Sequence, residues 1–301
     1  MIRIFGTIFA GLLGLAFGSF LNVCLSRWPQ GESVVQPRSH CRHCSHTLAW
    51  WENIPLLSWL ALRGRCRGCH AWIEWRYPLV EAAIGILWIC ASWSAIASLA
   101  YAINYAEGPM KDVFLDLSQA IPLMLFYWLL VALAVLDAEN LWLPDWITLP
   151  GIALGFAFKI LDLVLLAHFG GYDVFENEFG AYVAVFHWLL GILAAAALIL
   201  LIRWLYWLVR RREGIGLGDA KLMALLAAWL GFPGALLAFC LGAVLGAVFA
   251  LVQLALPATR NQSERWAASK LPLGTFLCIG GIISSLCGQQ IINAYLRWAG
   301  F

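Results

Sequence analysis

Two short stretches of the sequence place an aspartate beside a long apolar run. Asp137 ends one such run in LDAENLWLPDWIT, and Asp219 follows a glycine-rich stretch in EGIGLGDAKL, just before the next run. Two carboxylates that lie close together do not both ionise easily, so they hold a single proton between them. Such a pair can take a proton from water and give one to a carbonyl group, which is general acid–base hydrolysis of a peptide bond.

Each aspartate alone also has a simpler interpretation. An aspartate at the start of a helix is usually a cap, and one at a helix end before a polar loop is usually solvated. Spacing along the chain leaves open whether the two residues meet. The nearby glycines favour the catalytic interpretation, because they let the backbone turn sharply and let an extended substrate approach Asp219; they are Gly214, Gly216 and Gly218.

The composition indicates what kind of elements must position these residues. Of the 301 residues, 62% are hydrophobic and 12% are charged, whereas a soluble domain is about half apolar and about a quarter charged. We therefore predict an all-α polytopic membrane protein with no nucleic-acid partner. Apolar windows long enough to cross about 30 Å of hydrocarbon predict about eight transmembrane helices. The turn Phe232-Pro233-Gly234 separates the sixth from the seventh. The windows are 4–25, 78–100, 118–137, 143–167, 181–209, 220–232, 234–256 and 273–296.

The basic residues predict the orientation of these helices. Arginine and lysine are concentrated in residues 27–76, 210–212 and 260–270, whereas residues 107–116 and 173–178 are acidic. With eight spans, all three basic segments fall on one side, which the positive-inside rule assigns to the cytoplasm. We therefore expect both termini to be periplasmic or otherwise outside, and both aspartates to lie at the cytoplasmic edge of the membrane.

Between the first two predicted helices, four cysteines form two C-x2-C pairs. They are Cys41, Cys44, Cys66 and Cys69. Two such knuckles together make a tetrahedral four-sulfur zinc site, and four sulfurs leave no position open for catalysis. A segment of about 50 residues needs a metal to complete its stability. The alternatives are disulfides or one redox-active pair, which the reducing cytosol disfavours.

Several motifs, in the same order, resemble the type IV prepilin peptidases, which are membrane aspartic proteases with a GxGD turn. The matching stretches include GSFLNVCLSRWP (18–29), WENIPLLSWLALRGRC (51–66), RYPLVE (76–81), LDAENLWLPDWITLP (136–150) and EGIGLGDAKL (213–222). The resemblance implies that Asp137 and Asp219 are the catalytic pair. In LPLGTFL (271–277), which resembles the family's PFGP stretch, Leu273 and Thr275 replace phenylalanine and proline.

The resemblance also implies a substrate and a second activity. Members of this family remove the short basic leader from prepilins and pseudopilins, and many then methylate the new N-terminus with S-adenosylmethionine. We expect the chain to comprise a first transmembrane helix (1–26), a zinc-binding insert (27–77) and a membrane aspartic peptidase core (78–301). A basic leader requires acidic contacts, for which the candidates are Glu52, Glu74, Glu81, Glu139 and Asp145.

Other classes of membrane protein fit the sequence less well. A transporter or channel would also contain paired acids, but transport sites usually lie near the bilayer midplane in a repeated fold, and these acids lie at one edge. A zinc metalloprotease would need a motif such as H-E-x-x-H, which the sequence lacks. A disulfide-exchange protein is disfavoured by the cytoplasmic position expected for both cysteine pairs, and no lysine follows a recognisable serine nucleophile motif.

Overall fold

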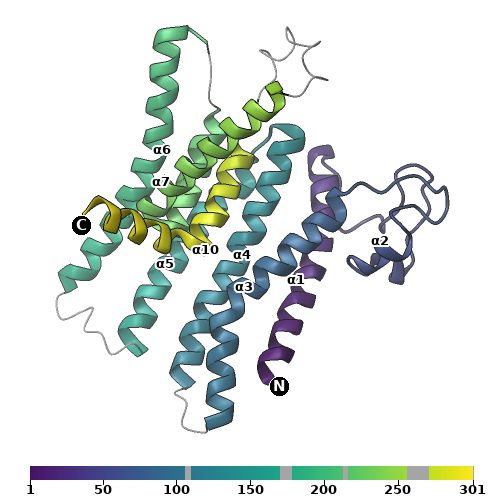
Figure 1. Ribbon diagram of the computed structural model, residues 1–301, viewed down its shortest axis with the longest axis horizontal. Coiled ribbons are helices and arrows are strands. Elements are labelled where there is room, and N and C mark those ends of the chain that lie inside the picture. Colours follow the sequence, from purple (N-terminus) through teal and green to yellow (C-terminus); the bar gives the residue numbers. More distant parts are fainter. Residues whose placement is uncertain (106–109, 170–177, 213–215, 256–270, 301) are drawn as a thin grey trace. The chain divides into compact units, whose positions relative to one another are not determined.

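The computed structural model describes the chain apart from residues 106–109, 170–177, 213–215, 256–270 and 301, and the described part is all-α without a named strand (Figure 1). Seven of its helices are long and apolar enough to cross a membrane. They are α1 (Ile2–Arg27), α3 (Arg76–Tyr105), α4 (Met110–Asn140), α5 (Asp145–Phe169), α6 (Glu178–Arg210), α7 (Leu217–Ala255) and α10 (Leu273–Ala299).

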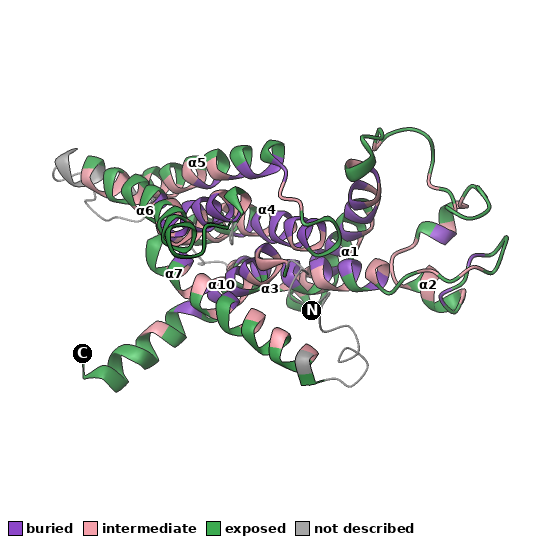
Figure 2. Ribbon diagram, turned by 90° about the horizontal axis from the view of Figure 1, so that it is seen from above, coloured by how far each residue is buried: buried purple, intermediate pink, exposed green. Residues whose placement is uncertain are grey.

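The outward faces of these helices are apolar. Large side chains such as Phe9, Phe114 and Val244 stay exposed, and Figure 2 shows exposed residues along much of the length of the helices. A soluble monomer rarely exposes apolar surface on this scale, whereas lipid covers it without cost. The chain is therefore a multi-pass membrane protein, as the composition predicts. It comprises two compact units, Met1–Ala132 and Leu133–Phe301.

In the first unit, α1 and α3 pack against each other along a row of small residues. A methyl group on Gly14 would lie 2.9 Å from the Cα atom of Gly85, and one on Gly18 would lie 2.8 Å from the Cα atom of Glu81. Small residues let membrane helices approach this closely. Because later residues of α1 meet earlier residues of α3, the two helices are antiparallel, and residues 28–75 connect their neighbouring ends.

The connecting segment is held to these helices by two buried charges. Arg27, at the end of α1, donates hydrogen bonds to the carbonyl oxygens of Ser33 (2.7 Å) and Pro37 (2.6 Å). Glu81, in the second turn of α3, accepts a hydrogen bond from the Leu56 N–H (2.8 Å). Within the segment, the only helices described are η1 (Trp28–Gln30), η2 (Trp50–Asn53) and α2 (Leu57–Ala61).

In the second unit, α7 contains the two helices predicted at 220–232 and 234–256. They meet at Gly231, whose backbone is non-helical (φ 73°, ψ 170°). The break therefore lies one residue before the predicted Phe232-Pro233-Gly234 turn. Glycine adopts this conformation without the strain that a Cβ atom would add, whereas proline suits the first turn of the arm that follows.

The two arms of α7 run in opposite directions. The first arm runs parallel to α5, because the Trp229 indole donates to the Gly151 carbonyl oxygen (2.9 Å) and Lys221 pairs with Asp145 (2.5 Å). The second arm is antiparallel to α10. The Ser284 hydroxyl donates to the carbonyl oxygen of Gly234 at the start of this arm (2.8 Å), and the rings of Phe249 and Phe276 meet at 5.4 Å near its end. Figure 1 shows α7 and α10 side by side.

We predict that Gly231→Ala destabilises the second unit. The substitution forces a β-carbon into a conformation that costs about 1–3 kcal/mol for residues other than glycine, and the added methyl group would lie 3.1 Å from the Trp188 ring. Thermal unfolding of the detergent-purified protein should show a lower midpoint. Gly246→Ala, in the helical part of the second arm, is the control and should change the midpoint little. Equal midpoints for the two variants would contradict a strained break at Gly231.

Candidate active site and metal centre

Asp137 lies in the last turn of α4 and is 6% exposed. One of its carboxylate oxygens, Oδ2, lies against the first turn of α10. The Thr275 N–H donates to it at 2.7 Å, and the Thr275 hydroxyl oxygen lies 3.2 Å away. The first N–H groups of a helix have no partner within the helix, so this buried carboxylate takes up a donor that α10 would otherwise leave unpaired.

Asp219 is the third residue of α7 and is 8% exposed. Its Oδ2 accepts a hydrogen bond from the Gly216 N–H at 3.1 Å. A side chain at the third helical position that reaches back to the N–H before the helix is half of a capping box. The simpler interpretation of Asp219 as a cap is therefore correct for one oxygen, and the cap also fixes the direction in which the carboxylate points.

The two carboxylates lie near each other. The charge of Asp137 acts on Asp219, and both act on the fully buried Cys278 one turn into α10. Leu143, in the short link between α4 and α5, fills the space between the starts of α7 and α10. A methyl group on Gly218 would lie 3.2 Å from its side chain, and one on Gly274 would lie 3.0 Å from it. The end of α4 and the starts of α5, α7 and α10 thus lie around the two acids.

Two of the glycines near Asp219, Gly216 and Gly218, make contacts that the sequence did not predict. A methyl group on Gly218 would lie 3.2 Å from the Leu143 side chain, which would have to shift slightly, whereas one on Gly216 would make an ordinary 3.4 Å contact with Asp219. Gly216 contributes its N–H to the carboxylate. Gly214 lies outside the described residues. Whether these glycines also admit a substrate stays a prediction.

Three of the acids proposed to contact a basic leader have structural partners. Glu52 is buried, accepts the Ala49 N–H at 2.6 Å and lies 3.4 Å from the His46 ring nitrogen. Glu81 accepts the Leu56 N–H, and Asp145 pairs with Lys221. These contacts hold the insert and the start of α5 in place. Among the five candidates they make Glu52 and Glu81 poorly suited to meeting a substrate.

The four cysteines of the insert come together as the spacing predicts. All four Sγ atoms lie within 4.8 Å of one another; Cys41 and Cys69 are 3.8 Å apart, and Cys44 and Cys66 are 3.9 Å apart. Four sulfurs bound tetrahedrally at about 2.3 Å from one ion are about 3.8 Å apart. The cluster therefore fits a four-coordinate metal ion.

The two knuckles that supply these sulfurs have the same local structure. In each, the first cysteine sulfur accepts a hydrogen bond from the N–H two residues later at 3.4 Å, from His43 to Cys41 and from Gly68 to Cys66. Such donors stabilise a thiolate. Each knuckle also places a non-glycine residue at positive φ four positions after its first cysteine, namely Ser45 (φ 56°) and His70 (φ 57°).

Cys41 and Cys44 differ in pKa because their surroundings differ. Burial opposes ionisation of Cys41, but the backbone N–H groups of His43 and Cys44 lower its pKa to about 7. A hydrogen bond from the His46 backbone lowers the pKa of Cys44, but loss of hydration and the neighbouring thiols outweigh it and raise this pKa to about 12. A thiolate and a thiol therefore lie side by side, and a divalent cation would displace the remaining protons.

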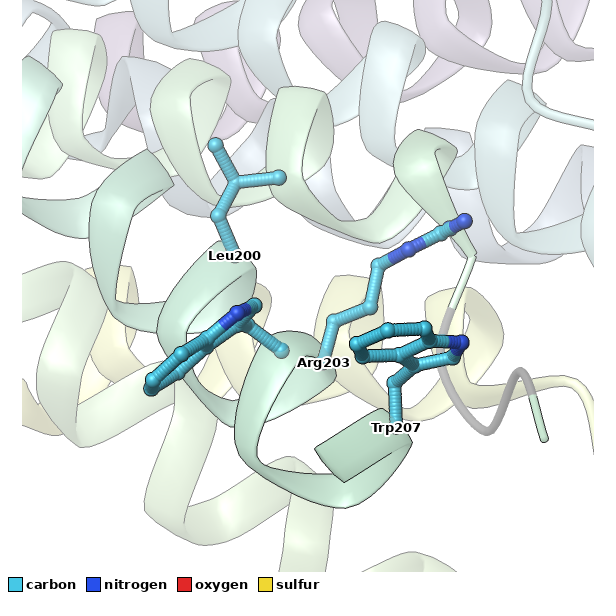
Figure 3. A pocket seen from close by; sticks show the side chains of 4 residues that line it. Leu200, Arg203 and Trp207 are labelled. Atoms are coloured by element: carbon cyan, nitrogen blue, oxygen red, sulfur yellow. The ribbon is translucent and has the colours of Figure 1, made fainter. Parts of the chain in front are cut away.

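A shallow pocket of about 330 Å³ lies on α6, lined by Leu200, Arg203, Trp204 and Trp207 (Figure 3). None of the residues predicted to do chemistry lines it. Arginine and tryptophan near the end of a membrane-spanning helix are typical of the interface with lipid headgroups. We assign the pocket no part in the site.

Comparison with known proteins identifies the family. Residues 12–95 match the bacterial peptidase A24 N-terminal domain, and residues 124–251 match the type IV leader peptidase family. The chain is 32% identical to the prepilin leader peptidase/N-methyltransferase of Stutzerimonas stutzeri, over 96% of this chain and 93% of that protein. The chain belongs to the type IV leader peptidase family.

Other members of this family are similar to the chain to the same degree. The proteins of the same name from Aeromonas hydrophila and Myxococcus xanthus are 34% and 35% identical to it. The first alignment covers 95% of this chain and 92% of the relative, and the second covers 89% and 72%. No solved structure matches this leader peptidase family member significantly.

Sequence reasoning missed the residues that surround the two acids. It predicted no role for Thr275, although a polar side chain just inside the last apolar run could have indicated one. It gave none to Leu143 or Gly274 either. Their importance depends on contacts between segments up to 141 residues apart in the chain, which local patterns do not reveal.

We predict that Gly274→Ala destabilises this region, because the added methyl group would lie 2.9 Å from the Asp137 Oδ2 and 3.0 Å from the Leu143 side chain. Overpacking of this kind typically costs about 1–3 kcal/mol, so the midpoint of thermal unfolding in detergent should fall. Gly288→Ala, farther along α10, is the control and should lower the midpoint less. Its methyl group would meet the end of the Ser284 side chain at 3.2 Å, whereas the one on residue 274 would meet Asp137 at 2.9 Å. An unchanged midpoint for Gly274→Ala would contradict the close packing described for this site.

Proposed function

We propose that this protein is an aspartic endopeptidase that removes the short basic leader from prepilin and pseudopilin precursors, with Asp137 and Asp219 as its catalytic pair. The observation that carries the proposal is that two buried carboxylates lie at the starts of α7 and α10, at one end of the second unit, where the charge of one acts on the other. Membership of the type IV leader peptidase family and the names of the relatives support the substrate class. Together they favour a peptidase over a transporter with paired acids.

The pair would hydrolyse a peptide bond while sharing one proton. The ionised aspartate takes a proton from water as the water oxygen bonds to the carbonyl carbon, and the protonated aspartate gives its proton to the carbonyl oxygen. When the resulting tetrahedral diol collapses, the C–N bond breaks. The leaving nitrogen then receives the proton taken from water, and the other aspartate recovers a proton from a diol hydroxyl. The pair ends with the one proton it had at the start.

The substrate explains why such a pair would lie at the end of a helix bundle. A precursor held in the bilayer by its apolar helix presents its leader at the membrane surface, where water is available for hydrolysis. We propose that this surface is the cytoplasmic face of the bacterial inner membrane and that both termini are periplasmic. The basic segments at 27–76 and 210–212 support this orientation.

We further propose that the protein methylates the new N-terminus with S-adenosylmethionine as donor. The names of the relatives include an N-methyltransferase. No residue is assigned to the donor. Transfer of a labelled methyl group from S-adenosylmethionine to a cleaved substrate would test this activity separately from cleavage. In this proposal residues 1–26 are the first transmembrane helix, 27–77 the zinc-binding insert and 78–301 the peptidase core.

The catalytic pair is tested by cleavage of a prepilin-like substrate in membranes. Asp137→Asn and Asp219→Asn should each reduce the cleavage rate by at least about 100-fold, since each removes a group that transfers a proton. Asp162→Asn is the control, because Asp162 is also an acid within a predicted span but binds Lys159 at 3.1 Å. Expression of all three should be compared with that of the wild type. Activity close to the wild-type rate in either Asp137→Asn or Asp219→Asn would exclude that aspartate from catalysis.

We propose that Cys41, Cys44, Cys66 and Cys69 bind one structural zinc ion. Their sulfur spacing supports this proposal, and four thiolates around zinc leave no site for a catalytic water. When bound, the ion supplies cross-links between the two knuckles. The residues of the insert then need fewer apolar contacts to stay folded.

Elemental analysis should find about one zinc per chain in purified wild-type protein. Cys44→Ser should lose most of the metal and make the insert sensitive to proteolysis, because metal binding is coupled to folding in such segments. Cys90→Ser, which changes an exposed cysteine on α3, is the matched control and should keep its zinc. Wild-type protein without zinc, or a Cys44→Ser variant that retains a full complement, would overturn the assignment.

A further inference from the structure

The two acids have different hydrogen-bond partners. Oδ2 of Asp137 receives the Thr275 N–H at 2.7 Å and has the Thr275 hydroxyl oxygen 3.2 Å away. Oδ2 of Asp219 accepts a hydrogen bond from the Gly216 N–H at 3.1 Å. Asp219 lies in the first turn of α7, and Asp137, at the end of α4, lies against the first turn of α10, so the positive end of a helix dipole acts on each. The side chain of Thr275 gives Asp137 a hydroxyl partner in addition to backbone N–H donors.

The Thr275 hydroxyl has two partners rather than one. Its oxygen lies 3.0 Å from the carbonyl oxygen of Ala134, one turn before Asp137 on α4, as well as 3.2 Å from the Asp137 Oδ2. A hydroxyl has one hydrogen to donate and also accepts hydrogen bonds, whereas a carbonyl oxygen only accepts. The hydroxyl can therefore take two arrangements around the same three oxygens without any movement of the backbone.

Each arrangement suits one protonation state of Asp137. When Asp137 is ionised, the hydroxyl donates its hydrogen to Oδ2, and hydrogen bonds donated to a carboxylate favour the charged form. When Oδ2 carries a proton, Oδ2–H donates to the hydroxyl oxygen, and the hydroxyl hydrogen turns to the Ala134 carbonyl. A general base passes through both states in every turnover, and this hydroxyl offers a partner in each.

We propose that Thr275 is a positioning residue that keeps Asp137 ionised in the resting pair, so that Asp137 takes the proton from water and Asp219 gives its proton to the scissile carbonyl. The proposal rests on the proposed catalytic pair. It adds the assignment of base and acid, and it gives the Thr275 side chain a task in turnover. No proton is gained or lost overall, because the hydroxyl only reorients while Asp137 accepts and later releases the proton of the water.

Thr275→Val tests the hydroxyl, because valine keeps the shape and the backbone N–H but can neither donate nor accept through its side chain. Steady-state cleavage of a prepilin-like substrate should show kcat lowered about 10- to 100-fold, as expected for loss of a hydrogen bond to a charged group, with KM nearly unchanged. Thr275→Ser restores the hydroxyl and should return kcat to within about 3-fold of wild type. A purely structural task would not separate kcat from KM in this way. If Thr275→Val does not fold, Thr275→Ala removes the same hydroxyl and takes its place.

The pH dependence of kcat distinguishes which acid is the base. Other titratable groups whose charges interact within this cluster are Asp219 on α7 and Cys278 on α10, so each limb of the profile belongs to the pair. If the hydroxyl stabilises ionised Asp137, its removal makes uptake of a second proton easier, and the acidic limb moves to higher pH. Movement of the alkaline limb to lower pH instead would show that Asp137 carries the shared proton, and would overturn the assignment.

The failure of this inference can be told apart from failure of the catalytic pair. If Asp137→Asn and Asp219→Asn are inactive while Thr275→Val has wild-type kcat and an unchanged pH profile, the pair stands and the task of Thr275 is wrong. If Asp137→Asn keeps its activity, the pair itself is wrong, and this inference falls with it.

Discussion

A buried negative charge needs hydrogen-bond donors, and this requirement organises the second unit. Leaving a carboxylate unpaired away from water is costly, while the first turn of every helix has N–H groups without partners. The starts of α7 and α10 bring these two needs together, because Asp219 accepts the Gly216 N–H and Asp137 accepts that of Thr275. Each carboxylate thus gains a hydrogen-bond donor, and each helix start gains an acceptor for an N–H group that would otherwise be unpaired.

The break in α7 makes this arrangement possible. A straight helix of 39 residues would be about 58 Å long at about 1.5 Å per residue, which is nearly twice the hydrocarbon thickness of about 30 Å. Because the chain turns back at Gly231, the second arm runs back toward the end of the unit that holds the acids, and α10 begins beside Asp137. Close packing at Gly218 and Gly274 against Leu143 then holds the helix ends at distances that larger residues would not permit.

The first unit solves a different problem, which is to hold a polar segment on a pair of membrane helices. Four sulfurs in one cluster, together with the buried Arg27 and Glu81, replace the apolar core that so short a segment lacks. Two of the acids predicted to contact a basic leader, Glu52 and Glu81, each accept a hydrogen bond from a backbone N–H of this segment. Charge near a site does not by itself indicate contact with a substrate.

The sequence by itself determined the properties that depend on composition and short-range spacing. Apolar length predicts membrane-spanning helices, since crossing a bilayer needs about 20 residues whatever their partners, and two C-x2-C pairs predict a metal site because each knuckle forms locally. The motifs around Asp137 and Asp219 also indicated the family. Only the tertiary structure decided that the helix break lies at Gly231, that Leu143 fills the space between two helix starts, and that Thr275 binds Asp137. The physical reason is that these contacts join segments far apart in the chain, and the energy of each depends on its partner rather than on its neighbours in sequence.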